Sequence, residues 1–175
     1  MYILEQSITR EYWKPIQDLI RDKINAGKYS VVPRSGGVIF VKLDRKTSAF
    51  AICDGWEPIG WVYLTSWGGG VYEVSQTFVL SAYRGNRYAE KLYKTAVNRV
   101  GITLVSGPCH SKYSRGLWKR FIEKRAFDIW ADDMCAKKSQ TPVKYVGNDL
   151  ICDLEVYHGL DDEKDVRLFA RRKNR

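Results

Sequence analysis

Polar and apolar residues alternate most clearly in the run VYEVSQTFV, from Val71 to Val79. A period of two, in a run rich in β-branched and aromatic residues, predicts a strand with one buried face. The period changes after Ala89, where the apolar positions follow one stripe of a helix. The residues of that stripe are Leu92, Ala96, Val97 and Val100. The pattern predicts a strand that leads into a helix through a turn containing Arg84 and Gly85.

The same two periods divide the rest of the chain into short elements. The expected helices cover residues 10–26, 89–100 and 114–124. The expected strands cover residues 2–7, 38–43, 48–53, 59–66, 71–79, 102–106, 127–131 and 150–157. Residues 132–146 show neither period, so we expect an irregular basic excursion there. Short polar or glycine-rich turns join the strands between residues 38 and 79, which predicts an antiparallel meander.

Length and composition fit one globular domain. The chain has 175 residues, of which 45% are hydrophobic and 28% are charged. There is no apolar run near eighteen residues and no charged-then-apolar leader, so we expect a cytoplasmic protein without a membrane segment. The four cysteines form no C-x-x-C pair, so we expect free thiols, no disulfides and no metal site.

The net charge of +9 implies an anionic partner, such as a phosphorylated cofactor, an acidic protein or a nucleic acid. Much of the excess lies in residues 112–125 and 171–175. A solvated terminus is the simple explanation for the second group. We therefore expect a folded domain over residues 1–160 and a charged C-terminal tail over residues 161–175.

The turn between the expected strand and helix has the chemistry of an anion site. The first N–H groups of a helix lack intrahelical partners, and the helix dipole adds positive charge there. Gly85 permits close approach of the backbone, and the guanidinium groups of Arg84 and Arg87 can bind phosphate oxygens. However, any strand–turn–helix unit can carry Arg-Gly, and a short glycine motif alone is a weak signal.

Residues 79–89, VLSAYRGNRYA, resemble the acetyl-CoA signature of the GNAT N-acetyltransferases, Arg/Gln-x-x-Gly-x-Gly/Ala. Arg84, Gly85 and Ala89 match the signature, whereas Arg87 replaces its middle glycine. Residues 123–127, EKRAF, resemble the family's Glu-Lys-x-Gly-Phe segment. The resemblance covers residues 1 to about 157. It implies an α+β fold with a mixed sheet of six or seven strands flanked by helices, in which the strands at 71–79 and 102–106 are parallel.

The resemblance also implies an activity and a cofactor site. The family transfers the acetyl group of acetyl-CoA to a primary amine by direct attack in a ternary complex. The acceptor would be a small molecule or a protein, and the chain would be a monomer or a homodimer. The backbone of the central strand polarises the thioester carbonyl, a role that falls on Phe78 and Val79. The implied cofactor-binding residues are Phe78, Val79, Arg84, Gly85, Asn86, Arg87, Tyr88 and Ala89.

Two residues are candidates for proton transfer. Glu73 precedes Arg84 by eleven residues, which is the spacing of the base in the histone-acetylating branch of the family. A solvated glutamate at a strand end is the alternative for Glu73. The family's usual acid is a tyrosine, but the matching position is Ile122. Tyr113 is our candidate for that role, and Cys109 and His110 lie in the same loop.

A binding protein on the same scaffold, with CoA, a protein or a nucleic acid as its partner, is the alternative function. Six tryptophans and eleven tyrosines are interleaved with 29 basic residues, a composition compatible with contacts to nucleic acid. A compact core with solvated faces would show the same composition. The sequence has no RRM, KH or zinc-finger signature.

Overall fold

The structure is a computed structural model that describes residues 3–107, 112–133, 138–146, 149–152, 155–157 and 166–173. Its helices are α1 (Ile3–Asn25), α2 (Tyr88–Lys94) and α3 (Lys112–Glu123), with a 3₁₀ turn η1 (Ser81–Tyr83) and a π-helical segment η2 (Thr95–Val100). Its first strands are β1 (Ser30–Val31), β2 (Val38–Lys42), β3 (Thr47–Asp54), β4 (Glu57–Gly68), β5 (Val71–Val79) and β6 (Thr103–Val105). The later strands are β7 (Asp128–Asp133), β8 (Lys138–Val146), β9 (Asp149–Cys152), β10 (Glu155–Tyr157) and β11 (Val166–Arg171).

The strands form one mixed sheet in the order β1-β2-β3-β4-β5-β6-β11-β7-β8-β9-β10. Strands β5 and β6 are parallel, and every other described pair is antiparallel. The expected α+β class and the parallel pair are therefore confirmed. The sheet of the described residues has eleven strands, more than the six or seven expected.

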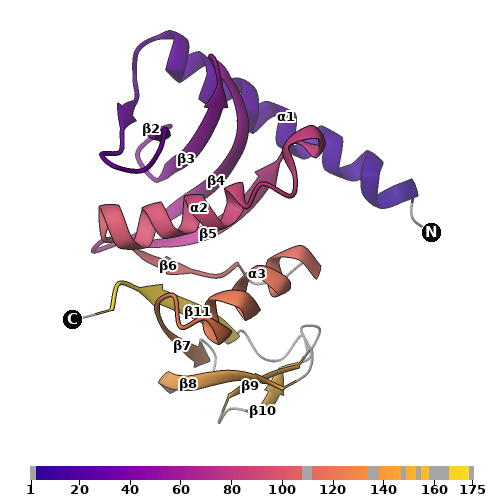
Figure 1. Cartoon of the computed structure of the whole chain (residues 1–175), viewed down its shortest axis with the longest axis vertical. Coiled ribbons are helices and arrows are strands. Elements are labelled where there is room, and N and C mark those ends of the chain that lie inside the picture. Colours follow the sequence, from indigo (N-terminus) through magenta and orange to yellow (C-terminus); the bar gives the residue numbers. More distant parts are fainter. Residues whose placement is uncertain are drawn as a thin grey trace.

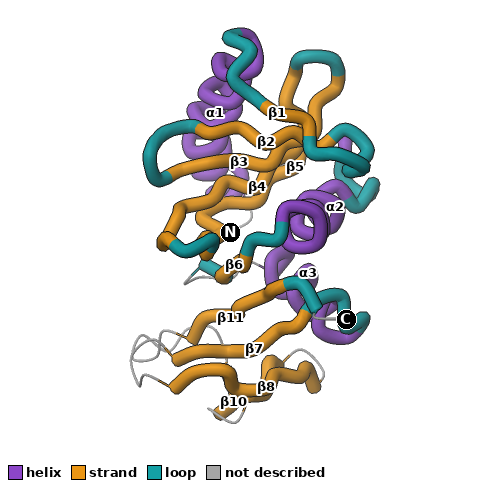
Figure 2. The backbone as a smooth tube through the Cα atoms, turned by 90° about the vertical axis from the view of Figure 1, so that its left-hand side faces the viewer, coloured by secondary structure: helices purple, strands orange, loops and turns teal. Residues whose placement is uncertain are grey.

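Helices cover both faces of the sheet. Figure 2 shows α1 on one face, and α2 and α3 together on the other. The core under α1 contains Ile20, Ile24, Ile39, Val41, Leu43, Ala49, Ala51 and Trp61. The larger core, under α2 and α3, runs from Val38 and Phe50 at one end of the sheet to Ala131 and Leu168 at the other. No helix in the described part of the chain combines the length and the apolar content needed to cross a membrane.

The antiparallel meander β2–β5 follows the sequence pattern closely. The expected hairpin between β2 and β3 is confirmed, and its turn is held by Asp44. The Asp44 carboxylate accepts hydrogen bonds from the N–H groups of Lys46 and Thr47 and from the Thr47 hydroxyl. These bonds lower the pKa of Asp44 below its usual value. These hydrogen bonds within the turn thus fix the register between β2 and β3, which are consecutive in the sequence.

The expected first strand, residues 2–7, is wrong, because α1 already begins at Ile3. Leu4, Glu5 and Gln6 favour a helix and continue into the expected helix at residues 10–26. The helix is attached to the sheet by polar contacts as well as by its core. Arg21 binds Glu57 at the start of β4 through two N–H donors, at 2.8 and 2.6 Å.

Two expectations for residues 132–157 are also wrong. Part of the expected irregular excursion is the strand β8, which pairs with β7 and β9. The expected single strand at residues 150–157 is the hairpin of β9 and β10. A largely apolar run of eight residues does not distinguish one strand from two short paired ones, and the Asp153 in its middle disfavours a continuous strand.

The expected charged tail at residues 161–175 requires the largest correction. Residues 166–171 form β11, which lies inside the sheet, between β6 and β7. Leu168 and Ala170 are buried in the large core, with 1% and 0% of their surface exposed. The alternation of Val166, Leu168 and Ala170 with Arg167 and Phe169 was present in the sequence, but the flanking charges concealed it. The folded domain therefore extends past residue 160.

Cys53, near the end of β3, is a free and half-buried thiol, as expected. Burial raises its pKa to about 11, so it is protonated at neutral pH. Cys109 and Cys135 lie outside the described residues, and only the backbone of Cys152 is described.

Candidate functional site

Strands β5 and β6 pair over a short stretch and then separate (Figure 1). Their parallel ladder begins at the Val71–Thr103 pair and ends at the Glu73–Val105 pair, where β6 stops. Strand β5 continues, and no described strand pairs with it on that side beyond Glu73. The six residues Val74–Val79 thus leave roughly 20 Å of strand edge without a strand partner. We call the region along this edge the split. Its backbone N–H and C=O groups can bind an extended ligand.

A β-bulge lies at the beginning of the split. Tyr63 and Leu64 are consecutive on β4, yet they pair with Gln76 and Val74, so Ser75 is left without a partner opposite it. The bulge reverses the faces of β5, so that Val74 lies in the large core whereas Gln76 accepts a hydrogen bond from the Trp61 indole on the α1 face. The regular alternation expected along β5 is therefore interrupted at Ser75.

The far end of β5 leads into the turn predicted to bind an anion. Arg84, Gly85, Asn86 and Arg87 are all exposed in this turn, which precedes α2. Arg84 Nε donates to the carbonyl of Val79 at 3.1 Å, and Asn86 Nδ2 donates to the carbonyl of Tyr83 at 3.2 Å. These two bonds hold the turn in shape while its charged groups face solvent.

Two residues of this turn have a left-handed backbone. Gly85 has φ of 88° and Arg87 has φ of 56°, both in the left-handed region. Arg87 thus has a conformation that favours glycine, at a cost on the order of 1 kcal/mol. A Cβ atom at Gly85 would meet nothing within 4 Å, so the space beside it is open to a ligand.

The remaining residues predicted to bind the cofactor differ in whether their side chains or their backbone groups are free to contact a ligand. Phe78 is stacked between Trp13 and Trp61 on the α1 face, with ring centroids 4.9 and 5.0 Å apart. Only the backbone of Phe78 is therefore suited to bind a ligand. Tyr88 and Ala89 are half-buried against the large core and contribute the first turn of α2.

Glu73, the candidate base, is held by two partners. Its Oε2 accepts a hydrogen bond from the Trp67 indole at 3.2 Å, and its Oε1 lies 3.6 Å from Arg167 Nη1. The Glu73 side chain is 21% exposed and that of Arg167 is 10% exposed. Arg167 Nη1 also donates to the carbonyl of Ser106, immediately after β6. The ion pair therefore bridges β5 and β11 at the point where the split begins.

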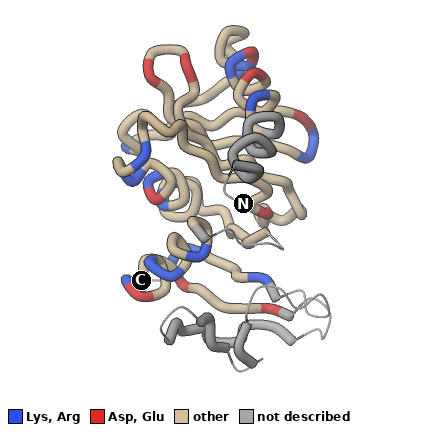
Figure 3. Tube along the Cα trace, turned by 90° about the vertical axis from the view of Figure 1, so that its right-hand side faces the viewer, with Lys and Arg blue, Asp and Glu red and all other residues tan. Residues whose placement is uncertain are grey.

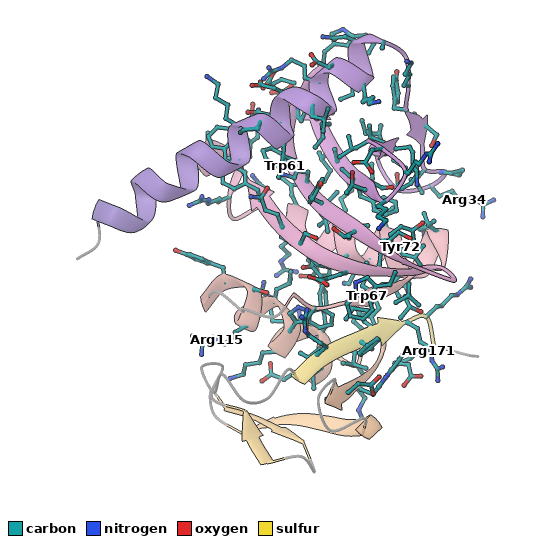
Figure 4. All side chains as sticks on the ribbon, turned by 180° about the vertical axis from the view of Figure 1, so that it is seen from behind. Arg34, Trp61, Trp67, Tyr72, Arg115 and Arg171 are labelled. Atoms are coloured by element: carbon teal, nitrogen blue, oxygen red, sulfur yellow. The ribbon has the colours of Figure 1, made fainter. Side chains whose placement is uncertain are left out.

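An aromatic row continues from Glu73 across the same face of the sheet. Trp67 meets Phe169 edge to face at 6.3 Å, and Phe169 stacks on Trp130 at 5.3 Å. The Arg171 guanidinium lies over the Trp130 ring at 5.0 Å. Figure 4 labels Trp61 beside α1, and Trp67 and Arg171 lower on this face.

Sequence reasoning missed Trp67, Ser106 and Arg167 as parts of the site. Trp67 lies close to Glu73 in sequence, across the Gly68–Gly70 turn, so the predicted hairpin could have indicated it. The alternation of residues 166–171 could have indicated a strand, but nothing local connects Arg167 to Glu73. That contact depends on which strands β11 joins, a property of the whole sheet.

The structure does not bring the two proton-transfer candidates together. Tyr113 lies in the first turn of α3 and is 82% exposed. Glu73 lies at the base of the split, where the described partners of its carboxylate are Trp67 and Arg167 and do not include Tyr113. Cys109 and His110, the alternatives, lie outside the described residues.

No protein-family model and no curated protein matches the chain. Similar solved structures include aminoglycoside 6'-acetyltransferase type Ii, with 17% identity over 76% of this chain and 74% of the other, and a TM-score of 0.43. A GNAT family acetyltransferase from Elizabethkingia anophelis with acetyl-CoA bound has 16% identity over 73% and 77%, with a TM-score of 0.39. A Bacteroides thetaiotaomicron protein assigned to the GNAT acetyltransferases has 16% identity and a TM-score of 0.41, and this chain spans 66% of its length. Similarity at this level assigns no activity to the chain.

Proposed function

We propose that the protein transfers an acetyl group from acetyl-CoA to a primary amine. One observation carries the proposal: the unpaired edge of β5 runs from Glu73 without interruption to a basic, glycine-containing turn. A ligand with an anionic group at one end and an extended, hydrogen-bonding arm fits this arrangement. Acetyl-CoA has that form, and when bound it supplies an acetyl thioester at the end of the arm.

The turn supplies the groups for the pyrophosphate. The N–H groups of the first turn of α2 have no intrahelical acceptors, and Gly85 leaves open space beside them. Arg84 uses its Nε for the Val79 carbonyl and retains four exposed N–H donors for phosphate oxygens. Arg87 adds a second guanidinium at the start of the helix. Along the split, backbone groups of Phe78 and Val79 would bind and orient the arm.

We assign to Glu73 the uptake of the proton that the acceptor ammonium must lose. In the proposed reaction the amine nitrogen attacks the thioester carbonyl and the carbon–sulfur bond breaks. Glu73 takes a proton from the ammonium through a bridging water, and Trp67 and Arg167 hold the carboxylate in one orientation. Tyr113 stays a prediction for the group that returns a proton to the departing sulfur.

A binding protein without turnover is the second candidate. Both oxygens of Glu73 already have a partner, and the exposed Tyr113 is not held near it. A scaffold with these features could bind CoA or an acyl-CoA without activating an amine. The two candidates agree on cofactor binding and differ in turnover.

Calorimetric titration with acetyl-CoA tests the shared part. Removing a charged hydrogen-bond donor costs about 1.5 to 3 kcal/mol, so Arg84→Ala and Arg87→Ala should each weaken binding about tenfold or more. Arg45→Ala is the matched control, because Arg45 is exposed in the distant β2–β3 turn. Unchanged affinity in both turn variants would remove the proposed cofactor site.

Release of CoA thiol with a panel of small primary amines and a lysine-containing peptide tests turnover. Glu73→Gln should lower kcat at neutral pH by about 10²- to 10⁴-fold and should recover at high pH, where the amine is already neutral. Trp67→Phe keeps an aromatic ring, although a smaller one, and removes the N–H donor to Glu73, so it should lower kcat less. No release with any amine, together with normal acetyl-CoA binding, would favour the binding protein. A Glu73→Gln variant with the wild-type rate at every pH would exclude Glu73 as the base.

A further inference from the structure

The positive charge of the chain is concentrated in one segment. Residues 84–125 contain eleven Lys and Arg residues and two acidic residues, a net charge of +9. The other 133 residues contain eighteen basic and eighteen acidic residues and are neutral in sum. The whole net charge of the protein therefore comes from residues 84–125, which contain α2, η2, β6 and α3 together with the turns before α2 and after α3.

These basic residues share one side of the molecule. Helices α2 and α3 both face the viewer in Figure 1, and Figure 3 shows their Lys and Arg residues on the same side of the trace, opposite α1. None of the ten described basic side chains of this segment is buried. We call the exposed ones the basic face: Arg84, Arg87, Lys94, Arg99, Arg115, Arg120, Lys124 and Arg125.

Basic residues in and beside α2 and α3 contribute to one electrostatic field. Lys94 lies 2.7 Å from Glu90, whose side chain is 10% exposed. The hydrogen bond from Lys94, and then the charges of Lys94, Lys124 and Arg87, hold the pKa of Glu90 below its usual value. Lys124 follows α3 and Arg87 precedes α2, so charges from both helices act on one carboxylate. On the α1 side, by contrast, Arg21 is paired with Asp18 and Glu57.

In the described part of the segment, few exposed apolar side chains accompany the basic face. Its segment contains two of the described exposed large hydrophobic residues, Val100 and Tyr113. Protein interfaces have an apolar core, and membrane-binding helices insert apolar side chains. Binding to a regular array of phosphates requires no apolar contacts. It is driven by the release of counterions when Lys and Arg side chains neutralise the phosphates.

We propose that the basic face binds the phosphate backbone of a nucleic acid, without dependence on base sequence. Helix α3, with twelve residues, is about 18 Å long. A duplex presents one negative charge per roughly 1.7 Å of its axis, so about ten phosphate charges lie along that length. Of the basic face, acetyl-CoA would cover only the turn at Arg84 and Arg87. The proposal goes beyond acetyl transfer and does not rest on it.

Fluorescence anisotropy with a labelled 20-base-pair DNA duplex and the same RNA duplex tests the proposal. Binding should weaken steeply as KCl is raised, with a slope of log K against log salt of about −0.9 per phosphate contact. The triple variant Arg115→Gln/Arg120→Gln/Lys124→Gln should weaken binding about tenfold or more and make the slope shallower by about 2 to 3. The matched control is Lys14→Gln/Lys28→Gln/Arg45→Gln, which removes the same charge from exposed positions elsewhere and should change little.

Three results would overturn the proposal. The control triple could weaken binding as much as the α3 triple, which would reduce the effect to overall charge. Saturating CoA could displace the duplex, while the α3 triple leaves the affinity for the duplex unchanged. These two results together would locate the binding at the cofactor turn. Polyglutamate at equal charge could compete as well as unlabelled duplex, which would favour an acidic protein. The α3 substitutions are at exposed positions, and thermal melting of each variant checks that the fold is retained.

Discussion

The two halves of the sheet are built in different ways. In the half from β1 to β5, each strand pairs with the strand next to it in the sequence, and cores lie on both faces. In the half from β6 to β10, the strand between β6 and β7 is β11, from the end of the chain. The first half is held by local pairings, whereas the second is complete only when the last strand is in place.

This difference lies next to the proposed site. Glu73 is on the last strand of the first half, and its partner Arg167 is on the strand that completes the second half. The parallel β5–β6 ladder and the Glu73–Arg167 pair are therefore where the two halves meet. A stable second half orients Glu73, and loss of β11 would remove one of its two partners.

The sharpest test of this comparison is a pair of matched core substitutions, Leu168→Ala on β11 and Leu64→Ala on β4. Leu64 and Leu168 are 0% and 1% exposed in the same core. Each substitution should lower the free energy of unfolding by about 2 to 5 kcal/mol, measured by urea denaturation. Lys173→Ala, at an exposed position just after β11, is the control and should change it by less than about 0.5 kcal/mol.

The two substitutions also test how the halves are coupled. If β11 is part of one cooperative domain, Leu168→Ala shifts a single transition that fluorescence and circular dichroism report alike. A neutral effect of Leu168→Ala would restore the charged tail expected from the sequence. Two separate transitions would show that the halves unfold independently.

The sequence allowed the first half to be predicted because its signals are local. The alternation of β2–β5, the Asp44 turn and the three consecutive glycines each act on residues that are adjacent in the chain. The second half was predicted less well because β11 obtains its place from distant partners. Flanking charges concealed its alternation, and its neighbours β6 and β7 could not be inferred from any turn.

The candidate site divides in the same way. The turn from Arg84 to Arg87 was predicted from adjacent residues, and the structure gives Arg87 the backbone of a glycine. The bulge at Ser75 was not predicted, because one extra residue in a strand leaves no mark in the composition. The partner of Glu73 was also missed, since Arg167 is brought to it only by the order of the strands.

A smaller effect is expected where the halves meet inside the core. Tyr93 on α2 lies 2.9 Å from the Thr77 hydroxyl on β5, and its ring contacts Trp118 and Phe121 on α3. Tyr93→Phe keeps the ring contacts and removes the hydrogen bond, so it should lower the free energy of unfolding by about 1 kcal/mol. A loss of unfolding free energy near that of Leu168→Ala would show that the hydroxyl hydrogen bond, and not the ring contacts, contributes most to the packing of α2 on its neighbours.

Tyr93 also predicts in which direction the free energy of unfolding changes with pH. Burial raises the pKa of Tyr93 to about 12, above the ordinary value of about 10 in the unfolded chain. The unfolded state therefore ionises first as the pH rises above about 10, and the wild type loses stability there. Urea denaturation between pH 8 and 11 should show a steeper loss for the wild type than for Tyr93→Phe. Parallel losses would mean that other groups cause the alkaline destabilisation.

The smallest effect is expected at the surface between the helices, where Glu90 meets Lys94 and the charge of Lys124. The pKa of Glu90 is lowered in the folded state, so its stabilising contribution is present above the unfolded value of about 4.3 and is lost as the pH falls through the folded value. Glu90→Gln should therefore cost about 0.3 to 0.5 kcal/mol at pH 7 and progressively less as the pH falls below about 4. Glu123→Gln is the matched control: Glu123 has the same i, i+4 spacing from Lys119, but the pair is 3.8 Å apart and its carboxylate is 53% exposed. An equal loss in both variants would show that overall charge, and not the close pair at Glu90, sets the stability of the basic face.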